Sequence, residues 1–253
     1  MIDNKVSYEN QTVIVTGAAR GIGAATARLV AARGAQVFAF DINREGLLDL
    51  QRELSLADSQ IGTLDIGNQN SISSTIAAVV KSAGKIDALI NTAGIVGPTN
   101  VKVEDVNWAD FENTLRVNLY GTIWLTQAVV PQMKAAKYGR IAHAASIAGK
   151  EGNPGMSPYN VSKSGMIGFI KGVAKEIAPD GITINALAPA VISTPMNADT
   201  SDETLKYMIS RIPMGRVGQA DEVAEILAFM GSRACSFTTG FTFDSSEIGR
   251  AHV

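Results

Sequence analysis

The sequence contains a single cysteine, Cys235, and two histidines, His143 and His252, among its 253 residues. One thiol cannot form a disulfide within the chain, and two histidines without neighbouring cysteines lack the grouping that holds a structural zinc ion. We therefore expect no metal site and interpret Cys235 as a small core residue. His143 falls within an apolar run that predicts a strand, where we expect a hydrogen-bonded structural histidine rather than a catalytic one.

An excess of charge of one sign is also missing, because 22 basic and 24 acidic residues give a formal net charge of −2. Without a basic stripe to neutralise phosphates, no nucleic acid partner is expected. The apolar runs, such as 13–15 and 123–125, are far shorter than the roughly 20 residues that span a bilayer. The N-terminal sequence MIDNKVSYENQ also lacks the apolar segment of a signal peptide. We expect a cytoplasmic protein with no membrane partner.

Apolar residues make up 46% of the chain, and they form short runs that alternate with longer helical patterns. Several of these runs are apolar throughout, as in parallel strands covered on both faces. The pattern predicts an α/β fold with one domain over residues 1–253: a doubly wound, Rossmann-like parallel sheet with helices on both faces. The predicted strands are Thr12–Thr16, Gln36–Phe40, Ile61–Leu64, Ile86–Ile90, Arg140–Ala145, Ile182–Leu187 and Phe241–Phe243.

Residues 189 to about 213 are rich in Ser, Thr, Asp and Met, and they follow the end of a predicted strand. Ligands bind at such strand ends in open α/β sheets. This segment is therefore predicted to be a mobile substrate lid.

A glycine-rich turn, Gly17-Ala18-Ala19-Arg20-Gly21-Ile22-Gly23, joins the first predicted strand to a helical pattern. Glycines allow a tight turn and a close approach of the backbone to a pyrophosphate, whose charge the free amides of a helix N-terminus can bind. The turn predicts a dinucleotide site; an ordinary βα turn is the alternative.

Two residues bear in opposite directions on which dinucleotide binds. Asp41 ends the second predicted strand, where a carboxylate accepts hydrogen bonds from the ribose hydroxyls of NAD and repels a 2′-phosphate. Arg20, in the glycine turn, could pair with that phosphate in NADP. We expect NAD, with NADP as the alternative, because repulsion from Asp41 is hard to offset in a partly closed site.

Tyr159 and Lys163 are four residues apart at the start of a helical pattern, so their side chains can share one face of the helix. A nearby ammonium stabilises a phenolate and is expected to lower the pKa of Tyr159. Ser146 follows a predicted strand and can hold a substrate oxygen beside the phenol. The three residues suggest hydride transfer to or from a secondary alcohol or ketone, with Tyr159 moving the proton.

Taken together, these features resemble the short-chain dehydrogenase/reductase family, in the group that includes 3-oxoacyl-carrier-protein reductases and many alcohol dehydrogenases. The resemblance covers nearly the whole chain and rests on several motifs in family order. They are the turn at 16–23, Asn91-Thr92-Ala93-Gly94, Asn118, Ser146, the Tyr159/Lys163 pair and the segment 189–196.

The resemblance implies catalytic roles for four residues. Tyr159 resembles the acid/base, Ser146 the group that binds the substrate oxygen, and Lys163 a residue that also binds the nicotinamide ribose. Asn118 resembles the asparagine that helps to hold a water on a proton route; a helix kink or cap is its other interpretation.

The resemblance also implies a wider cofactor site. Asp65 and Ile66 look like the adenine pocket, Asn91, Ala93 and Gly94 like the turn beside the adenosine ribose, and Thr194 like the contact to the carboxamide. Structural hydrogen bonding is the alternative for Asn91 and Thr194. The full predicted cofactor set is Gly17, Arg20, Gly21, Ile22, Gly23, Asp41, Asp65, Ile66, Asn91, Ala93, Gly94, Tyr159, Lys163, Pro189 and Thr194.

The sequence departs from the family at Pro189-Ala190, where Pro-Gly is common, and after Phe243, where paired glycines are usual. If position 190 had a positive φ, alanine would be strained by about 1 kcal/mol or more. Family members often form tetramers through this tail and through the helices at 105–134 and 159–177. A homotetramer is therefore expected, with its tail-mediated contacts in doubt.

Three functions remain open from the sequence. The leading one is an NAD-dependent oxidoreductase acting on a small ketone or secondary alcohol. The second is an NADPH-dependent 3-oxoacyl thioester reductase, which Arg20 favours and Asp41 opposes. The third is a dinucleotide-binding regulatory protein without catalysis, which the Ser146, Tyr159 and Lys163 set opposes.

Overall fold

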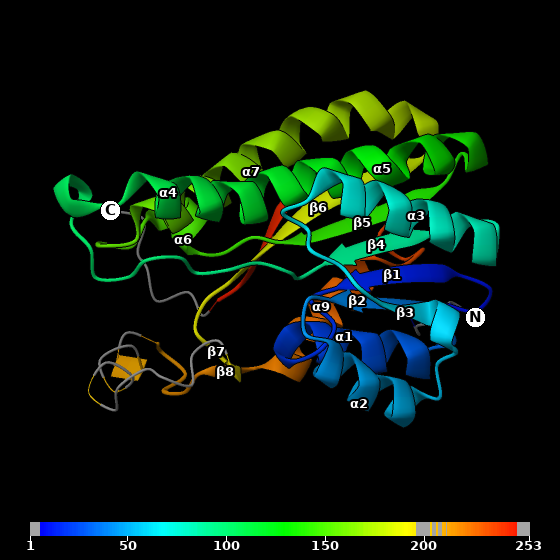
Figure 1. The fold of residues 1–253 in the computed structure, drawn as a ribbon, viewed down its shortest axis with the longest axis horizontal. Helices are drawn as coiled ribbons and strands as arrows, with labels where there is room; N and C mark the ends of the chain where they lie inside the picture. The colour runs from blue at the N-terminus through cyan, green and yellow to red at the C-terminus, as the bar shows by residue number, and fades with distance from the viewer. Residues whose placement is uncertain (1–5, 196–202, 204–205, 207–208, 211, 247–253) are drawn as a thin grey trace.

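The computed structural model describes residues 6–195, 203, 206, 209–210 and 212–246. Its centre is a parallel sheet of seven strands in the order β3-β2-β1-β4-β5-β6-β9, seen from the side in Figure 1. The strands are β1 (Thr12–Thr16), β2 (Gln36–Asp41), β3 (Ile61–Thr63), β4 (Ala88–Asn91), β5 (Gly139–Ala144), β6 (Ile182–Pro189) and β9 (Thr242–Ser245). A separate two-stranded sheet pairs β7 (Ile192–Ser193) with β8 (Gly218–Gln219).

Helices cover both faces of the large sheet (Figure 1). On one face lie α1 (Gly21–Ala32), α2 (Arg44–Leu54) and α9 (Ala220–Met230). On the other lie α3 (Gln69–Ala83), α4 (Trp108–Leu115), α5 (Gly121–Ala136) and α7 (Ser157–Ile177), with the short α6 (Ala148–Glu151) leading into α7. A π-helical turn, Arg116–Tyr120, joins α4 to α5, and single 3₁₀ turns occupy Asp58–Gln60, Val103–Asp105 and Ala178–Asp180.

Strand side chains alternate between two cores. Ile14 of β1 packs into the core beneath α3, α5 and α7, whereas Val13 and Val15 pack into the core beneath α1, α2 and α9. Every residue of β1 and β6 is buried, because helices shield both faces of the sheet. This explains why the strands read as continuous apolar runs.

The order of the strands locates the ligand crevice. The chain runs outward from β1 to β3 and then returns to place β4 on the other side of β1. Open α/β sheets bind ligands outside the carboxyl ends of the strands at this reversal. The residues that follow β1, β4 and β5, including the glycine turn and Ser146, meet there.

The predicted fold class is confirmed, and all seven predicted strands are present, the first with the predicted bounds and the other six with shifted ends. The fourth strand begins at Ala88 rather than Ile86, and the sixth continues to Pro189. Of the predicted lid, residues 196–202, 204–205, 207–208 and 211 lie outside the described residues, and its beginning forms β7. Cys235 is buried with 1% exposure, as expected of a core residue. Among the helices of the described ranges, none is long and apolar enough to cross a membrane.

Candidate active site

The glycine turn after β1 has a backbone that only glycine adopts easily. Gly17 has φ +72° and Gly21 has φ +56°. A Cβ placed on Gly23 would lie 1.9 Å from the carbonyl oxygen of Gly17, so the turn folds tightly against the start of α1. Arg20, the N-cap of α1, makes no side-chain cap hydrogen bond, and the first turn of α1 has no acidic residue. This uncapped, positive helix end fits a pyrophosphate.

Asp41, at the end of β2, is tied to the glycine turn. The amide of Ala19 donates to its Oδ2 at 3.0 Å, and the amide of Asn43 donates to its Oδ1 at 2.8 Å. Asp41 is thus both a turn residue and a carboxylate placed beside the predicted pyrophosphate site. Arg20 is exposed on the same turn. The structure brings together the two residues that favour different dinucleotides.

The predicted adenine pocket is built by the turn after β3. Asp65 Oδ1 accepts the amide of Gly67 at 2.8 Å, and Arg116 Nη1 donates to the Gly67 carbonyl at 2.8 Å. Ile66 is buried with 4% exposure. Asp65 therefore shapes the turn that the resemblance assigns to adenine.

Asn91 ends β4 and links it to β1. Its Oδ1 accepts the Thr16 hydroxyl at 2.6 Å and the Ala93 amide at 3.2 Å. The neighbouring Thr92 hydroxyl donates to the Thr16 carbonyl at 2.8 Å. Asn91 therefore has the structural role, and it also shapes the turn through Ala93 where the ribose contact is predicted.

His143 completes this network from β5. Its Nδ1 lies 3.2 Å from Asn91 Nδ2, and its Nε2 lies 3.0 Å from Thr126 Oγ1. The Thr126 hydroxyl donates to the Thr122 carbonyl at 2.8 Å, so it accepts from the imidazole. We assign the proton of neutral His143 to Nε2. The expected structural role of His143 agrees with these contacts.

Burial lowers the pKa of His143 to about 3, and the charge of Lys163 adds to the lowering. The ordinary pKa near 6.5 belongs to the unfolded chain, which gains a proton below that pH while the folded chain does not. We predict that, as the pH falls from 6.5 to 3, this group lowers the unfolding free energy of the unmodified protein (the parent) by up to about 1.4 kcal/mol per pH unit.

Urea titrations of the parent and of His143→Asn at several pH values measure this loss. Asparagine does not titrate, so the difference in unfolding free energy between the two proteins should change with pH over that window. A difference that stays constant with pH would contradict the prediction.

Ser146 and Tyr159 meet in the folded chain. The Ser146 hydroxyl accepts a hydrogen bond from the Ala148 amide at 3.1 Å. This bond orients the hydroxyl relative to the start of α6. A hydrogen bond to Ser146 lowers the pKa of Tyr159, but burial is the larger influence and raises it. Tyr159 is therefore held as a phenol in the site.

Lys163 points toward the same site from α7. Its Nζ donates to the Ala144 carbonyl at 2.8 Å and lies 5.6 Å from the centroid of the Tyr159 ring. Burial lowers the pKa of Lys163 to about 8. The expectation that Lys163 lowers the pKa of Tyr159 does not describe this structure, because the net shift is upward and burial causes it.

Asn118 lies in the π-helical turn and is fully buried. Its Oδ1 accepts the Ile95 amide at 2.9 Å, and its Nδ2 donates to the Ile95 carbonyl at 2.8 Å and to Ser162 Oγ at 3.1 Å. The expected helix irregularity is present as this π turn, a feature frequent at functional sites. The role of Asn118 in a proton route stays a prediction.

Ser162 is a site residue that the sequence analysis missed. Its hydroxyl donates to the Tyr159 carbonyl at 2.8 Å and accepts from Asn118. A serine inside a helix, three residues after Tyr159, commonly bonds back to the preceding turn. That spacing was the available signal; the partner from the π turn was not visible in the sequence.

Gly94 belongs to the turn that is predicted beside the adenosine ribose, whereas Thr194 and Pro189, at the end of β6, belong to the predicted cofactor set that follows β6. A Cβ on Gly94 would lie 3.0 Å from Asn118 Oδ1 and 3.6 Å from Lys163 Nζ, so only a small residue fits there. A Cβ on Gly21 would lie 3.4 Å from that of Thr194, which places Thr194 over the glycine turn.

Ala190 follows Pro189 at the end of β6, and its amide donates to the Ser245 carbonyl at 3.1 Å. Non-glycine residues with positive φ in the described chain are Asn10, Ser55, Asn100 and Lys137. Ala190 is not among them, so the strain considered for this position does not arise. The bond to Ser245 also shows that the altered tail still pairs beside the site.

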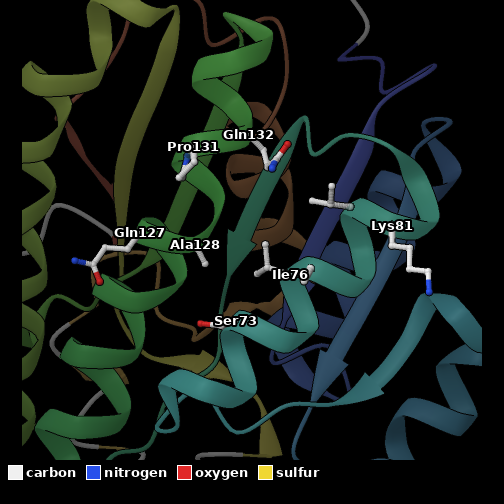
Figure 2. Close-up of a pocket in the computed structure, with 9 residues that line it drawn as sticks. Ser73, Ile76, Lys81, Gln127, Ala128, Pro131 and Gln132 are labelled. Carbon is white, nitrogen blue, oxygen red and sulfur yellow. The ribbon is translucent and has the colours of Figure 1, made fainter.

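A groove of about 530 Å³ lies elsewhere, between α3 and α5 (Figure 2). Ile76 and Ala128 face it, and the side chains of Lys81 and Gln127 extend away from each other at its edges in Figure 2. None of the predicted site residues lines this groove. It is separate from the crevice at the carboxyl ends of the strands.

Comparison with known proteins identifies the family of the chain. The family described as Enoyl-(Acyl carrier protein) reductase matches residues 17–245. A "2-dehydro-3-deoxy-L-rhamnonate dehydrogenase (NAD(+))" from a Sphingomonas species is 39% identical over 94% of this chain and 95% of its own. A "3-oxoacyl-[acyl-carrier-protein] reductase FabG" from Thermotoga maritima is 38% identical over 92% of this chain and 94% of its own.

The fold is shared with proteins of known structure. The structure titled "Crystal Structure of Levodione Reductase" superposes with a TM-score of 0.89 at 28% identity, covering 94% of this chain and 97% of that one. The family match spans nearly all of the chain, including the glycine turn, Ser146, Tyr159 and Lys163. The chain is therefore an oxidoreductase of the short-chain dehydrogenase/reductase family.

Proposed function

We propose that this protein is an NAD-dependent oxidoreductase that interconverts a ketone and a secondary alcohol, with Tyr159 as the acid/base. The observation that carries the proposal is the convergence of Ser146, Tyr159 and Lys163 beside the glycine turn. The carboxyl ends of β1 and β5 and the start of α7 supply these residues from distant parts of the sequence. When bound, a nicotinamide accepts or donates the hydride.

The residues of the chain supply the proton chemistry. Ser146 holds the substrate oxygen next to the Tyr159 hydroxyl, and the buried phenol donates its proton to a carbonyl oxygen during reduction. In oxidation the phenol must first release its proton, and the tyrosinate oxygen then takes the proton of the alcohol. Lys163 holds its ammonium near the Tyr159 ring. Because its pKa is about 8, this group can release and regain a proton close to neutral pH.

Asp41 supports NAD as the cofactor, and the NAD(+)-dependent relative agrees with it. We expect catalytic efficiency to be at least about tenfold higher with NADH than with NADPH, equivalent to about 1.4 kcal/mol in transition-state binding. Asp41→Asn removes the negative charge while keeping an acceptor for one backbone amide, so the preference should shrink. Initial rates with both cofactors measure this.

Arg20→Gln is the counterpart of Asp41→Asn, because it removes the positive charge that could pair with the 2′-phosphate of NADP. It should lower efficiency with NADPH and leave that with NADH nearly unchanged, because the 2′-phosphate is the only group that differs. A parent that prefers NADPH tenfold or more would overturn the NAD assignment.

A 3-oxoacyl thioester reductase is the second candidate, and the similarity to 3-oxoacyl-[acyl-carrier-protein] reductases supports it. A panel of small ketones, 2-oxo and 3-oxo acids and a 3-oxoacyl thioester, each with NADH and NADPH, separates the candidates. Faster turnover of the thioester with NADPH would select the second. Absence of turnover with every substrate, together with NAD binding, would select the regulatory protein.

The assembly and the lid belong to the proposal as well. We expect a homotetramer, and light scattering coupled to gel filtration tests it. The predicted substrate lid at 189–213 stays part of the proposal, and of its described residues Thr194 lies over the glycine turn.

A further inference from the structure

The loop Gly152–Met156 joins the two catalytic elements. It leaves α6, whose start binds the Ser146 hydroxyl, and enters α7, which carries Tyr159. Gly152 and Gly155 both have φ +74°, a conformation that glycine adopts without strain. Glycines of this kind permit the turn but do not hold it in place.

The side chain of Asn160 holds the loop from the helix. The Asn153 amide donates to Asn160 Oδ1 at 3.0 Å, and Asn160 Nδ2 donates to the Asn153 carbonyl at 2.8 Å. A carboxamide offers an acceptor and a donor side by side, so it satisfies both backbone groups of one residue. Asn160 is in the first turn of α7, and helical side chains tilt toward the N-terminus, where the loop lies.

A second contact restrains the other side of the loop. The Val101 amide donates to the Gly155 carbonyl at 3.2 Å. A Cβ on Gly155 would lie 3.0 Å from Asn100 Cα, so the two backbones are packed closely. The loop is thus held between α7 and the segment that follows β4, and both of these elements border the site.

We propose that Asn160 is a positioning residue that fixes the loop Gly152–Met156 as one wall of the substrate site. A substrate oxygen between Ser146 and Tyr159 places its carbon substituents beside the chain that connects these residues. The hydrogen bonds of the Asn160 side chain go to the backbone of Asn153 in the loop. The inference rests on the proposed function for the identity of the site. The pair of hydrogen bonds between Asn160 and the Asn153 backbone, called the clamp below, can be tested without a substrate.

Hydrogen exchange measured by mass spectrometry tests the clamp. In Asn160→Ala, peptides covering 152–156 should exchange about tenfold faster than in the parent, because two hydrogen bonds to the backbone are lost. Asn153→Ala is the matched control, since it keeps the backbone groups that Asn160 binds, and should exchange like the parent after correction for intrinsic rates. Equal exchange in the parent and Asn160→Ala would overturn the proposal.

Asn160→Asp separates the clamp from a simple packing effect. An ionised carboxylate can accept from the Asn153 amide but faces the Asn153 carbonyl without a donor, whereas the protonated acid restores both bonds. The exchange of the loop relative to the parent should therefore be fast at neutral pH and approach the parent rate as the pH falls through the carboxyl pKa. A ratio that does not change with pH would contradict the pairing.

Kinetics test the link to substrate. In Asn160→Ala, KM for the ketone should rise about fivefold, kcat should stay within about twofold, and Kd for NAD(H) should be unchanged, the pattern of lost substrate binding. Loosened exchange with an unchanged KM would refute the role in the substrate wall. A parent without ketone turnover would refute the proposed function instead, and the exchange experiments would still decide the clamp.

Discussion

Tyr159→Phe is expected to lower kcat by about 100-fold or more, within the range of 10² to 10⁴ typical of general acid–base catalysis. The ring remains, so its packing and its position 5.6 Å from Lys163 Nζ are kept. Only the hydroxyl that bonds Ser146 and carries the proton is removed. Steady-state rates and the Kd for NADH, measured by fluorescence, should show lost turnover with cofactor affinity within about twofold of the parent.

Tyr120→Phe is the control for this change. Tyr120 ends the π-helical turn and is 43% exposed, so losing its hydroxyl should leave turnover unchanged. Full activity of Tyr159→Phe would refute the proton role of Tyr159. Loss of cofactor binding together with activity would show instead that the hydroxyl supports the structure of the site.

Gly23→Ala is expected to abolish NAD(H) binding and to lower the unfolding free energy by about 1–3 kcal/mol, the usual cost of overpacking. The new Cβ would lie 1.9 Å from the Gly17 carbonyl oxygen and 2.5 Å from Thr92 Oγ1. The oxygen of Gly17 belongs to the backbone, so the turn must move. The amides at the start of α1 would then no longer point at the predicted pyrophosphate position. Calorimetric titration with NAD and urea denaturation measure the two effects.

Gly172→Ala provides the matched control in α7. A Cβ there meets nothing within 4 Å, and alanine favours a helix over glycine by about 0.5–1 kcal/mol. This variant should bind NAD normally and be slightly more stable. Normal NAD affinity in Gly23→Ala would show that the glycine turn does not hold the pyrophosphate.

Local patterns in the sequence were sufficient for the architecture and for most of the candidate site. Short runs rich in apolar residues predicted all seven strands, and in β1 and β6 every residue is buried because helices cover both faces of the sheet there. The spacing of Tyr159 and Lys163 predicted a shared helix face because helical geometry depends only on separation along the chain. Strand ends were less accurate, since the pairing of β4 with β5 and of β6 with β9, rather than hydrophobicity, sets where they stop.

Contacts between distant residues decided the rest. The pKa of Tyr159 was expected to fall because of Lys163, but desolvation depends on everything packed around the phenol and reverses the direction. His143 showed no partner in the sequence, and β4 and α5 supply Asn91 and Thr126 only after the sheet has formed. Ala190 is unstrained because β6 continues to pair with the tail, a property of the folded edge of the sheet.

Asn160 illustrates the division most clearly. Its sequence neighbours Tyr159 and Lys163 marked the helix as catalytic, yet its carboxamide gained a role only when two positive-φ glycines brought Asn153 back against α7. The order of residues specified which groups lie on each element, because backbone periodicity is local. Which groups are in contact, and whether each titratable group is protonated, depends on burial and on hydrogen bonds that exist only in the folded chain.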